Sequence, residues 1–592
     1  MGDARACVLS RAMEMASVVG LPLKVRPGGS TRGQGETQRT VRCRAAVAHK
    51  NTQWTGFSRA SSIGGDTQVS LPATSHVPRQ RRVHIRKHTK RFNAASVPLS
   101  ESDGDANDAS ADSSDGNSTQ KNASEKKSNV LRLLGIKNGI LGVEQSRVEM
   151  VMHQALPVMG GMASQNVLNL ADSVMVGRLG TACVASVGIA STLNFQCQAA
   201  LQGISSGVQA MSARRIGEGR PEFAAVPLNA ALVACVCLGV PMAVAAFIAA
   251  PSIVPRLTSD PAVIAAAVPY LKARLLAVPA VGVNFAFRGF WNAVQQPQIY
   301  MNTLLVMHIV NVSLSLLLIF GASFSLPLIG NITIPSLGVV GAGIGTTVSV
   351  WVGTALYLKM GFQRAKEMGF ARKKPSAEDL KTLLGQAAPT SITNLLFATG
   401  MTVLYWIVGK LGTAETAAVN VLINLMLTLV LPCMGMGLAA GALSGRALGR
   451  GDVEDAAQWP WDVAKLTAAM MFGIGMIAVV IPEKLLSYFL TNQEAIAKAT
   501  LPLRFTGITV AFDALSVTMQ NALLGVGDAK KVAAISIGTQ WVLFLPVAYL
   551  GVTYFPGFNL NYLWGLYVAQ RVLQGFLYAN IWKKGGWKDI KV

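Results

Sequence analysis

Gly177-Arg-Leu-Gly-Thr-Ala182 returns almost unchanged as Gly409-Lys-Leu-Gly-Thr-Ala414, 232 residues further along the chain. Other residues repeat at the same offset. These pairs are Gln154 and Gln386, Pro157 and Pro389, Gly203 and Gly435, Ser212 and Ser444, Arg214 and Arg446, and Gly217 and Gly449. A single register kept over so many positions indicates an internal duplication, with each copy forming the same structural unit.

Apolar stretches follow one another through the duplicated region, each long enough to cross roughly 30 Å of hydrocarbon. Twelve are predicted, at residues 151–176, 182–210, 225–250, 261–287, 299–321, 336–358, 384–408, 414–443, 461–482, 496–521, 532–554 and 560–582. Each copy holds six, an even number, so both copies enter the membrane from the same side. The expected fold is an all-α integral membrane protein with two six-helix repeats, residues 130–370 and 371–592.

Composition agrees with a membrane protein. The chain is 51% hydrophobic and only 14% charged, which leaves too few polar residues to cover a soluble core of 592 residues. The net charge of +22 is concentrated at one end, because residues 1–99 hold 17 Lys and Arg against 4 Asp and Glu. Because most of the basic excess lies outside the predicted helices, we expect the folded region to lie in a lipid bilayer and not to bind nucleic acid.

The basic N-terminal stretch is rich in Arg, Ser and Thr and lacks the apolar run of a secretory signal. We interpret residues 1–45 as a plastid transit peptide ending near Val41-Arg42-Cys43-Arg44-Ala45; a mitochondrial address and a plain disordered tail are the alternatives. Residues 46–129 are predicted to be a disordered linker. Residues 130–143 are predicted to be an interfacial helix. A plastid envelope membrane, with both termini on the stromal side, is the expected location.

Basic residues in the loops predict the orientation. We call the side of the membrane that holds the N-terminus side A, and the opposite side B. Loops on side A carry many basic residues, including Arg214, Arg215, Arg220, Lys359, Arg364, Lys366, Arg372, Lys373, Lys374, Arg446, Arg450, Lys530, Lys531, Lys583 and Lys584. Loops on side B carry only Arg178, Arg256, Lys410 and Lys484. This bias supports both the helix count and the assignment of the termini to side A.

The duplicated motifs resemble the multidrug and toxic compound extrusion family over essentially all of residues 145–585. The resemblance is carried by Ala155-Leu-Pro157, by Asn169 to Ala182, by Ala213 to Arg220, by Leu337 to Gly343, and by Phe512-Asp-Ala with Leu524-Gly-Val-Gly-Asp528. It implies two six-helix lobes in a V shape, a large central cavity, and export of a small organic solute by antiport with protons or sodium.

Asp513 lies near the middle of the tenth stretch, where a charged side chain costs about 2.5–3.5 kcal/mol on insertion scales. Thr506, Thr509, Asp513, Ser516 and Gln520 follow helical steps of three and four, so they share one face, which we expect to line a wet cavity. Asp513 also matches a coupling acid of the family. Without an acid in the seventh stretch, it would act alone in the second lobe. An aspartate bonded within the bundle for packing is the alternative.

Asp172 lies about one turn from the end of the first stretch, so depth alone allows an interfacial residue. Pro157, Gly161, Gln165, Asn169 and Asp172 trace one face, and the aspartate matches the carboxylate of the family's N-lobe cation site. Pro157 leaves a carbonyl unpaired in mid-helix, and Gly161 follows one turn later, so we interpret these two residues as a hinge.

Asn311 in the fifth stretch also matches a polar site residue of the family, and Thr346 in the sixth is a further candidate for ion coupling. Ser315 departs from the pattern, because many relatives have a second aspartate there. With one carboxylate fewer, the site suits a hard cation less well, which favours protons over sodium.

Substrate contacts are expected from the polar faces of three helices. The candidates are Gln165, Asn169, Asn194, Gln198, Gln202, Thr509, Ser516 and Gln520. Hydrogen bonds between helices are an equally good explanation for the asparagine and glutamine residues of the second stretch.

No cofactor or metal is expected beyond the coupling ion, since Cys and His form no cluster with ligand spacing and no phosphate-binding loop motif is present. A monomer that carries a small organic solute is the expected working unit. Two other interpretations stay open. A flippase for lipid-linked precursors would favour a strongly basic cavity, whereas the stretches offer few cations, chiefly Lys272, Arg274 and Arg504. A membrane-embedded enzyme would need paired catalytic groups at one depth.

Overall fold

The computed structural model describes residues 141–326, 330–490 and 492–590. The predicted transit peptide, the linker and most of the interfacial helix at 130–143 therefore lie outside the described residues. The described residues are mostly helical and hold both copies of the repeat.

The first repeat runs from α3 to α10. Its elements are α3 (Gln145–Gly177), α4 (Thr181–Gly217), η1 (Pro221–Phe223), α5 (Val226–Ala234), η2 (Cys235–Gly239), α6 (Val240–Ile253), η3 (Val254–Arg256), α7 (Pro261–Leu275), α8 (Val278–Ala293), α9 (Pro297–Phe320) and α10 (Val339–Arg364). Between α9 and α10 lies an antiparallel hairpin of β1 (Ala322–Leu326) and β2 (Gly330–Ile334), with Ala322 opposite Ile334. The sequence did not indicate this hairpin.

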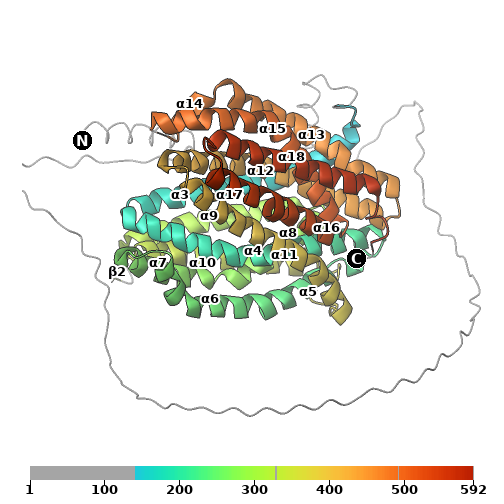
Figure 1. The fold of residues 1–592 in the computed structure, drawn as a ribbon. Helices are drawn as coiled ribbons and strands as arrows, with labels where there is room; N and C mark the ends of the chain where they lie inside the picture. Colours follow the sequence, from blue (N-terminus) through green and yellow to red (C-terminus); the bar gives the residue numbers. More distant parts are fainter. Residues whose placement is uncertain (1–140, 327–329, 491, 591–592) are drawn as a thin grey trace, which may run out of the picture. The chain divides into compact units, whose positions relative to one another are not determined.

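The second repeat has the same order of long helices without the hairpin. Its elements are α11 (Ala377–Gly409), α12 (Thr413–Gly449), α13 (Val453–Val480), α14 (Pro482–Ser487), α15 (Gln493–Gly525), α16 (Ala529–Ile537), η4 (Gly538–Phe544), α17 (Leu545–Tyr554) and α18 (Leu560–Lys584). In Figure 1 the green helices of the first repeat gather on one side of the bundle, and the orange and red helices of the second on the other. We call the first repeat the N-lobe and the second repeat the C-lobe.

Twelve segments correspond to the twelve predicted stretches, but their apolarity differs. Seven are long and apolar enough to cross a membrane, and α7 with α8, bent by 46° at their junction, makes an eighth. The remaining four, α3, α4, α15 and α18, contain 33, 37, 33 and 25 residues, which is enough to span a bilayer. They carry more polar side chains, and these include most of the candidate site residues.

Prolines explain where predicted spans are interrupted. The fourth breaks before Val278-Pro279, and the π-helical segments η2 and η4 each lie directly before a proline turn, at Pro241 and Pro546. Proline lacks the N–H needed for the i to i−4 bond, so the helix changes its hydrogen-bond pattern at that point.

The repeated hexapeptide forms the turn between the first two helices of each lobe. Gly180 has φ 109° and ψ 169°, and its counterpart Gly412 has φ 148° and ψ 173°. Only glycine adopts this region of backbone space without strain. The motif is therefore duplicated because both lobes begin with the same tight helix-to-helix turn.

The lobes meet through reciprocal contacts. A Cβ added to Gly203 on α4 would lie 2.2 Å from the Ala387 carbonyl oxygen on α11, and one added to Gly435 on α12 would lie 3.3 Å from the Ala155 carbonyl oxygen on α3. Ala155 and Ala387 are themselves a repeat pair. Contacts that exchange in this way are those of two units related by a twofold axis, as the duplication predicts.

The seam is closest at the side A ends of α4 and α12. A Cβ added to Gly217 would lie 2.1 Å from the Arg446 carbonyl oxygen, and one added to Gly449 would lie 2.3 Å from the Arg214 carbonyl oxygen. The two contacts are counterparts of one another, because Gly449 repeats Gly217 and Arg446 repeats Arg214. Backbone-to-backbone contact of this kind leaves no room for a passage between α4 and α12 at this level.

Replacing Gly180 by Ala should lower the free energy of unfolding by about 1–3 kcal/mol, because a side chain is strained at this φ and ψ. No other atom would crowd the new Cβ, so the loss would report backbone strain alone. Gly188→Ala, in mid-α4 with equally open space, is the matched control and should stabilise slightly. Thermal unfolding of the purified protein in detergent measures both, and equal stability of the two variants would contradict the account.

Candidate functional site

The C-lobe contains a buried ion pair between α15 and α18. The Arg571 Nε lies 2.7 Å from the Asp513 Oδ1, and the two side chains are 15% and 5% exposed. Asp513 was predicted to act without a second acid in this lobe; the structure adds a basic partner, Arg571, that the sequence did not indicate. Two opposite charges held together in a low-dielectric interior stabilise one another, whereas either alone would be costly there.

Arg571 extends the pair into a hydrogen-bonded chain. Its Nη1 donates to the Gln574 Oε1 at 2.9 Å, and the Gln574 Nε2 donates to the Tyr578 hydroxyl at 3.3 Å. That hydroxyl lies 2.5 Å from the Ser536 Oγ on α16. The chain connects three helices of the C-lobe, so a change at Asp513 can reach α16 through bonded groups.

The polar face of α15 packs against α18 over most of its length. The Thr506 Oγ1 accepts a hydrogen bond from the Trp564 Nε1 at 2.9 Å, and Ser516 is fully buried with its Cβ 3.3 Å from a Cβ placed on Gly575. Thr509 is half-buried and donates to its own helix at the Phe505 carbonyl. The predicted wet face is therefore mainly a contact between helices. Gln520, half-buried near the side A end of α15, is separate from this group.

Asp172 in the N-lobe differs from Asp513 in having no ion pair within 4 Å among the described residues. The carboxylate is half-buried on α3, and its Oδ1 is enclosed without a hydrogen-bond partner. Arg274, in the last turn of α7, attracts it only through a longer Coulomb interaction, and the Arg274 Nε is likewise enclosed and unbonded. An acid in this state keeps a free oxygen for a proton, a cation or water.

One to two turns before Asp172, α3 carries a polar cluster, of which the sequence predicted Gln165 and Asn169. The Gln165 Nε2 donates to the Asn169 Oδ1 at 3.2 Å, and the Gln165 Oε1 lies 3.2 Å from the His308 Nε2 on α9. Asn169 is exposed and His308 is half-buried. His308 was missed, because a lone histidine in an apolar stretch shows no partner until the helices are placed.

Asn311 and Ser315 form a second buried pair on α9. Both are fully buried, and the Ser315 Oγ donates to the Asn311 Oδ1 at 3.4 Å. Among the residues that the structure describes, none bonds the Asn311 Nδ2. Thr346 on α10 donates to its own helix at the Ala342 carbonyl. In the part of the chain that the structure describes, no hydrogen bond joins Asp172 to Asn311 or Thr346, so these predicted ion ligands are not gathered into one shell.

The other candidates lie on α3 and α4. Asn194 is buried with its Oδ1 unbonded, and Gln198 and Gln202 are half-buried on the same helix. Pro157 lies inside α3, which continues unbroken from Gln145 to Gly177. A Cβ on Gly161 would lie 3.1 Å from Leu304 and Tyr300 side-chain atoms of α9. Gly161 therefore permits close packing of α3 on α9, which accounts for the glycine without a hinge.

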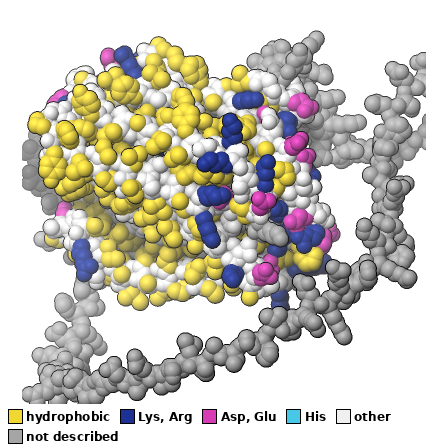
Figure 2. Space-filling view, turned by 45° about the vertical axis from the view of Figure 1, so that its right-hand side comes forward, with side chains coloured by type: hydrophobic (Ala, Val, Ile, Leu, Met, Phe, Trp, Pro, Cys, Tyr) yellow, Lys and Arg dark blue, Asp and Glu magenta, His cyan; other side chains and the backbone are white. Residues whose placement is uncertain are grey.

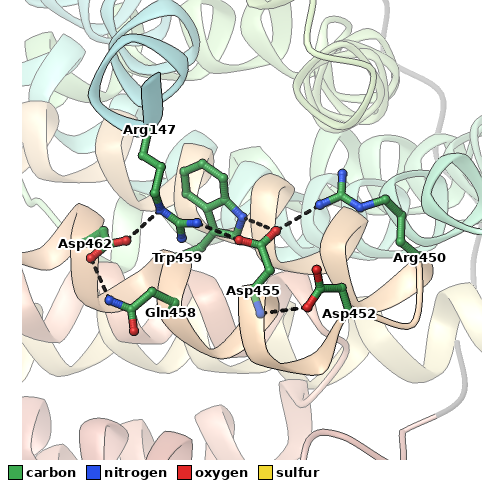
Figure 3. A network of polar contacts seen from close by, with 7 residues as sticks. All are labelled: Arg147, Arg450, Asp452, Asp455, Gln458, Trp459 and Asp462. Atoms are coloured by element: carbon green, nitrogen blue, oxygen red, sulfur yellow. Dashed lines mark hydrogen bonds and ion pairs between the residues drawn. The ribbon is translucent and has the colours of Figure 1, made fainter. Parts of the chain in front are cut away.

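An ionic cluster closes the lobes on side A (Figure 3). Arg147 at the start of α3 lies between two acids of α13, with its Nη1 2.6 Å from the Asp455 Oδ1 and its Nε 2.7 Å from the Asp462 Oδ2. Its guanidinium also stacks 3.7 Å above the Trp459 ring. Arg450 reaches the other oxygen of Asp455 at 2.9 Å. The first helix of the N-lobe is thus tied to the third helix of the C-lobe.

A second tie uses the counterpart position in the other lobe. Asp379 on α11, the repeat counterpart of Arg147, forms an ion pair with Arg215 at the side A end of α4. Arg446 bonds Gln295, and the Gln209 Nε2 donates to the Leu438 carbonyl at 2.9 Å. Every one of these contacts joins the N-lobe to the C-lobe, so the space that the resemblance implies between the lobes is shut on side A.

Comparison with known proteins identifies relatives of both repeats. The sequence model of the MatE family matches residues 157–317 and 389–550, one match in each repeat. A probable multidrug resistance protein NorM from Thermotoga maritima is 25% identical over 438 residues, covering 73% of this chain and 92% of that protein. The multidrug resistance protein NorM of Vibrio cholerae is 24% identical over 443 residues, covering 72% and 93%.

Solved structures share the fold. An outward-facing conformation of a multidrug resistance MATE family transporter superposes with a TM-score of 0.67 at 20% identity, covering 74% of this chain and 95% of that one. A MOP superfamily transporter from Pyrococcus furiosus gives a TM-score of 0.66, also at 20% identity and the same coverage. These likenesses confirm the predicted twelve-helix, two-repeat fold. The relatives are transporters, which confirms that the chain is not an enzyme.

Removing one member of the C-lobe pair should be far more harmful than removing both. Arg571→Met leaves Asp513 buried without a counter-ion and should cost about 3–5 kcal/mol of stability, whereas Asp513→Leu with Arg571→Met should recover most of that loss. Chemical unfolding of the four members of this cycle in detergent gives the coupling energy. Losses that simply add would mean that the two charges do not depend on one another.

Proposed function

Because the chain belongs to the MatE family of membrane transporters, we propose that it exports a small organic solute by antiport with protons or sodium ions. The names of the relatives, multidrug resistance proteins, support an organic solute. The closed side A supports a carrier that opens its two faces in turn. A flippase for lipid-linked precursors is not favoured by the comparisons.

Buried arginines also argue against the flippase. The sequence indicated few cations inside the membrane, but Arg288 and Arg571 are additional buried ones. Each is bonded within its own lobe, Arg288 through its Nε to the Ser205 Oγ at 3.2 Å and Arg571 to Asp513. Arg571 is neutralised by Asp513, whereas Arg288 keeps its charge but is 9% exposed and hydrogen-bonded within the N-lobe. One such cation does not make a strongly basic cavity.

Asp172 carries the proposal for ion coupling. A coupling acid must exchange its ion with water on each side in turn, and a carboxylate with an unbonded oxygen can do so without first breaking an ion pair. Asp513 is the second proposed coupling acid, and it acts through Arg571, since protonating it would release that guanidinium. Asn311 and Thr346 are proposed to assist in the N-lobe, and movement of α3 about Pro157 and Gly161 is proposed to follow protonation of Asp172.

The solute is proposed to contact polar residues of both lobes. The proposed contacts are Gln165, Asn169, Asn194, Gln198, Gln202, Thr509, Ser516 and Gln520. Accessibility divides these residues. Asn194 and Ser516 are buried, whereas the others are at least partly exposed and so have the better support, namely Gln165, Asn169, Gln198, Gln202, Thr509 and Gln520.

Asp172→Asn should lower gradient-driven transport at least tenfold while leaving the unfolding temperature unchanged, because the variant can neither bind nor release the coupling ion. Purified protein in proteoliposomes, with an imposed pH gradient and ethidium as the fluorescent solute, gives the rate. Asp260→Asn is the matched control, since this exposed carboxylate caps α7 and asparagine caps equally well. Undiminished transport by Asp172→Asn would refute its role.

The same vesicles distinguish the ions. A sodium gradient without a pH gradient should leave transport near background, because Ser315 leaves Asp172 without a second carboxylate beside Asn311 to hold a hard cation. Full transport with sodium alone would reverse this assignment.

The site of action is proposed to be a plastid envelope membrane, on the strength of the basic, Arg-rich N-terminal stretch, in which residues 1–99 hold 17 Lys and Arg against 4 Asp and Glu. We further propose that a monomer is the transport unit. The full chain fused at its C-terminus to a fluorescent protein should label the plastid rim in a plastid-bearing cell. A mitochondrial or plasma-membrane signal would contradict the assignment.

A further inference from the structure

A pocket of about 200 Å³ lies on side A, where the end of α4 meets the start of α11. Basic side chains dominate its wall, from Arg215 in the last turn of α4, from Arg220 just after α4, and from Lys373 and Lys374 before α11. Phe223, Val226 and Asp379 complete the wall. We call this the basic pocket. Figure 2 shows Lys and Arg side chains gathered in a band toward one end of a largely hydrophobic surface, as expected for side A.

The loop that presents the two lysines is held in one conformation. The buried Asn229 of α5 donates through Nδ2 to the carbonyls of Gly369 and Lys373, at 3.0 and 2.9 Å, and its Oδ1 accepts from the Ala371 N–H at 3.1 Å. Ala371 and Gly369 have φ values of 55° and 94°. Basic loops on side A need only charge, so a buried asparagine holding a strained loop is more than orientation requires.

The charges in the basic pocket do not cancel. Arg215 is paired with Asp379 and Arg220 with Glu218, and Glu222 is the other nearby acid on this segment. Lys373 and Lys374 have no carboxylate within 4 Å among the described residues, and the Lys373 Nζ instead lies 3.1 Å above the Phe223 ring. Two unneutralised ammonium groups beside two guanidinium groups attract an anion with several acceptor oxygens.

We propose that the basic pocket binds a phosphate group and that this anion competes with Asp379 for Arg215. The phosphate can belong to an anionic lipid headgroup or to a free phosphorylated compound, since both offer the same oxygens. A water molecule needs only about 10–15 Å³ of such space, so a pocket of about 200 Å³ has room for a phosphoryl group with its ester oxygen and several waters.

Competition for Arg215 has a consequence for the lobes. The Arg215–Asp379 pair joins α4 to α11 and is one of the ionic contacts that shut side A. A phosphate that draws Arg215 away leaves Arg147 with its acids as the main remaining ionic tie, and so eases opening on that side. This effect on transport rests on the proposed function, whereas phosphate binding does not. Linkage requires that opening, in turn, tightens phosphate binding.

The binding experiment uses the full chain in nanodiscs. Glycerol 3-phosphate is titrated by calorimetry into phosphatidylcholine discs, and the thermal stability of phosphatidic acid discs is compared with that of phosphatidylcholine discs. The double variant Lys373→Gln, Lys374→Gln should raise the dissociation constant for glycerol 3-phosphate at least tenfold. In phosphatidic acid discs the same variant should lose the lipid's stabilising effect. Lys583→Gln with Lys584→Gln, an adjacent exposed pair at the side A end of α18, is the matched control and should stay within twofold.

Asp379→Asn is expected to raise the phosphate affinity, a gain that a misfolded variant would not show. It removes the competitor for Arg215 and keeps an acceptor for the cap at Ser376, so phosphate affinity should rise severalfold. Binding of the soluble probe assigns the site to free phosphate, and an effect of phosphatidic acid alone assigns it to lipid. The proposal is overturned if neither probe binds, if the control pair loses as much, or if Asp379→Asn binds no better.

In proteoliposomes, the probe that binds should raise the ethidium transport rate at least twofold in the unmodified chain and not in the Lys373→Gln, Lys374→Gln variant. Binding without this acceleration would overturn the link to side A while leaving the phosphate site in place. Absence of any ethidium transport in unmodified protein that binds phosphate would instead count against the proposed function.

Discussion

The structure depends on how charge is tolerated inside a membrane. A charged side chain in hydrocarbon must find a partner, reach water or be part of a working site. Asp513 meets this requirement through Arg571 at 2.7 Å, in a largely enclosed setting between α15 and α18. Asp172 has no such ion pair among the described residues; its carboxylate is half-buried, and one of its oxygens is enclosed without a hydrogen-bond partner. The two lobes therefore hold their acids differently, the C-lobe with a counter-ion and the N-lobe without one within 4 Å.

The same polar side chains explain which helices are less apolar. Seven of the twelve segments are apolar enough to be recognised as spans by composition, whereas α3, α4, α15 and α18 carry most of the candidate site residues. On side A the lobes are tied by Arg147 with Asp455 and Asp462, by Arg215 with Asp379, and by backbone contact at Gly217 and Gly449. Apolar residues also pack across the lobes, among them Leu383 and Ala387 of α11 and Val148 and Val151 of α3, so opening side A must separate hydrophobic as well as polar contacts.

Much of this architecture could be predicted from the sequence, because hydropathy and a fixed repeat offset are properties of the chain alone. The duplication explains why Gly180 and Gly412 form the same turn, and why Ala155 and Ala387 hold equivalent positions, each against a glycine of the other lobe. Partners across helices could not be predicted. Each residue turns a helix by about 100°, so contacts such as Asp513 with Arg571 or Gln165 with His308 depend on helix rotations that no local pattern records.

The most direct test of this account is infrared difference spectroscopy of the purified protein with and without ethidium, which follows the carbonyl band of protonated carboxylic acids. Solute binding should change this band in the unmodified chain; Asp172→Asn should remove most of the change, and Asp513→Asn should remove only the smaller part of it. A band change that survives Asp172→Asn in full, or one that disappears in Asp513→Asn, would place the main exchangeable proton elsewhere and contradict the central claim.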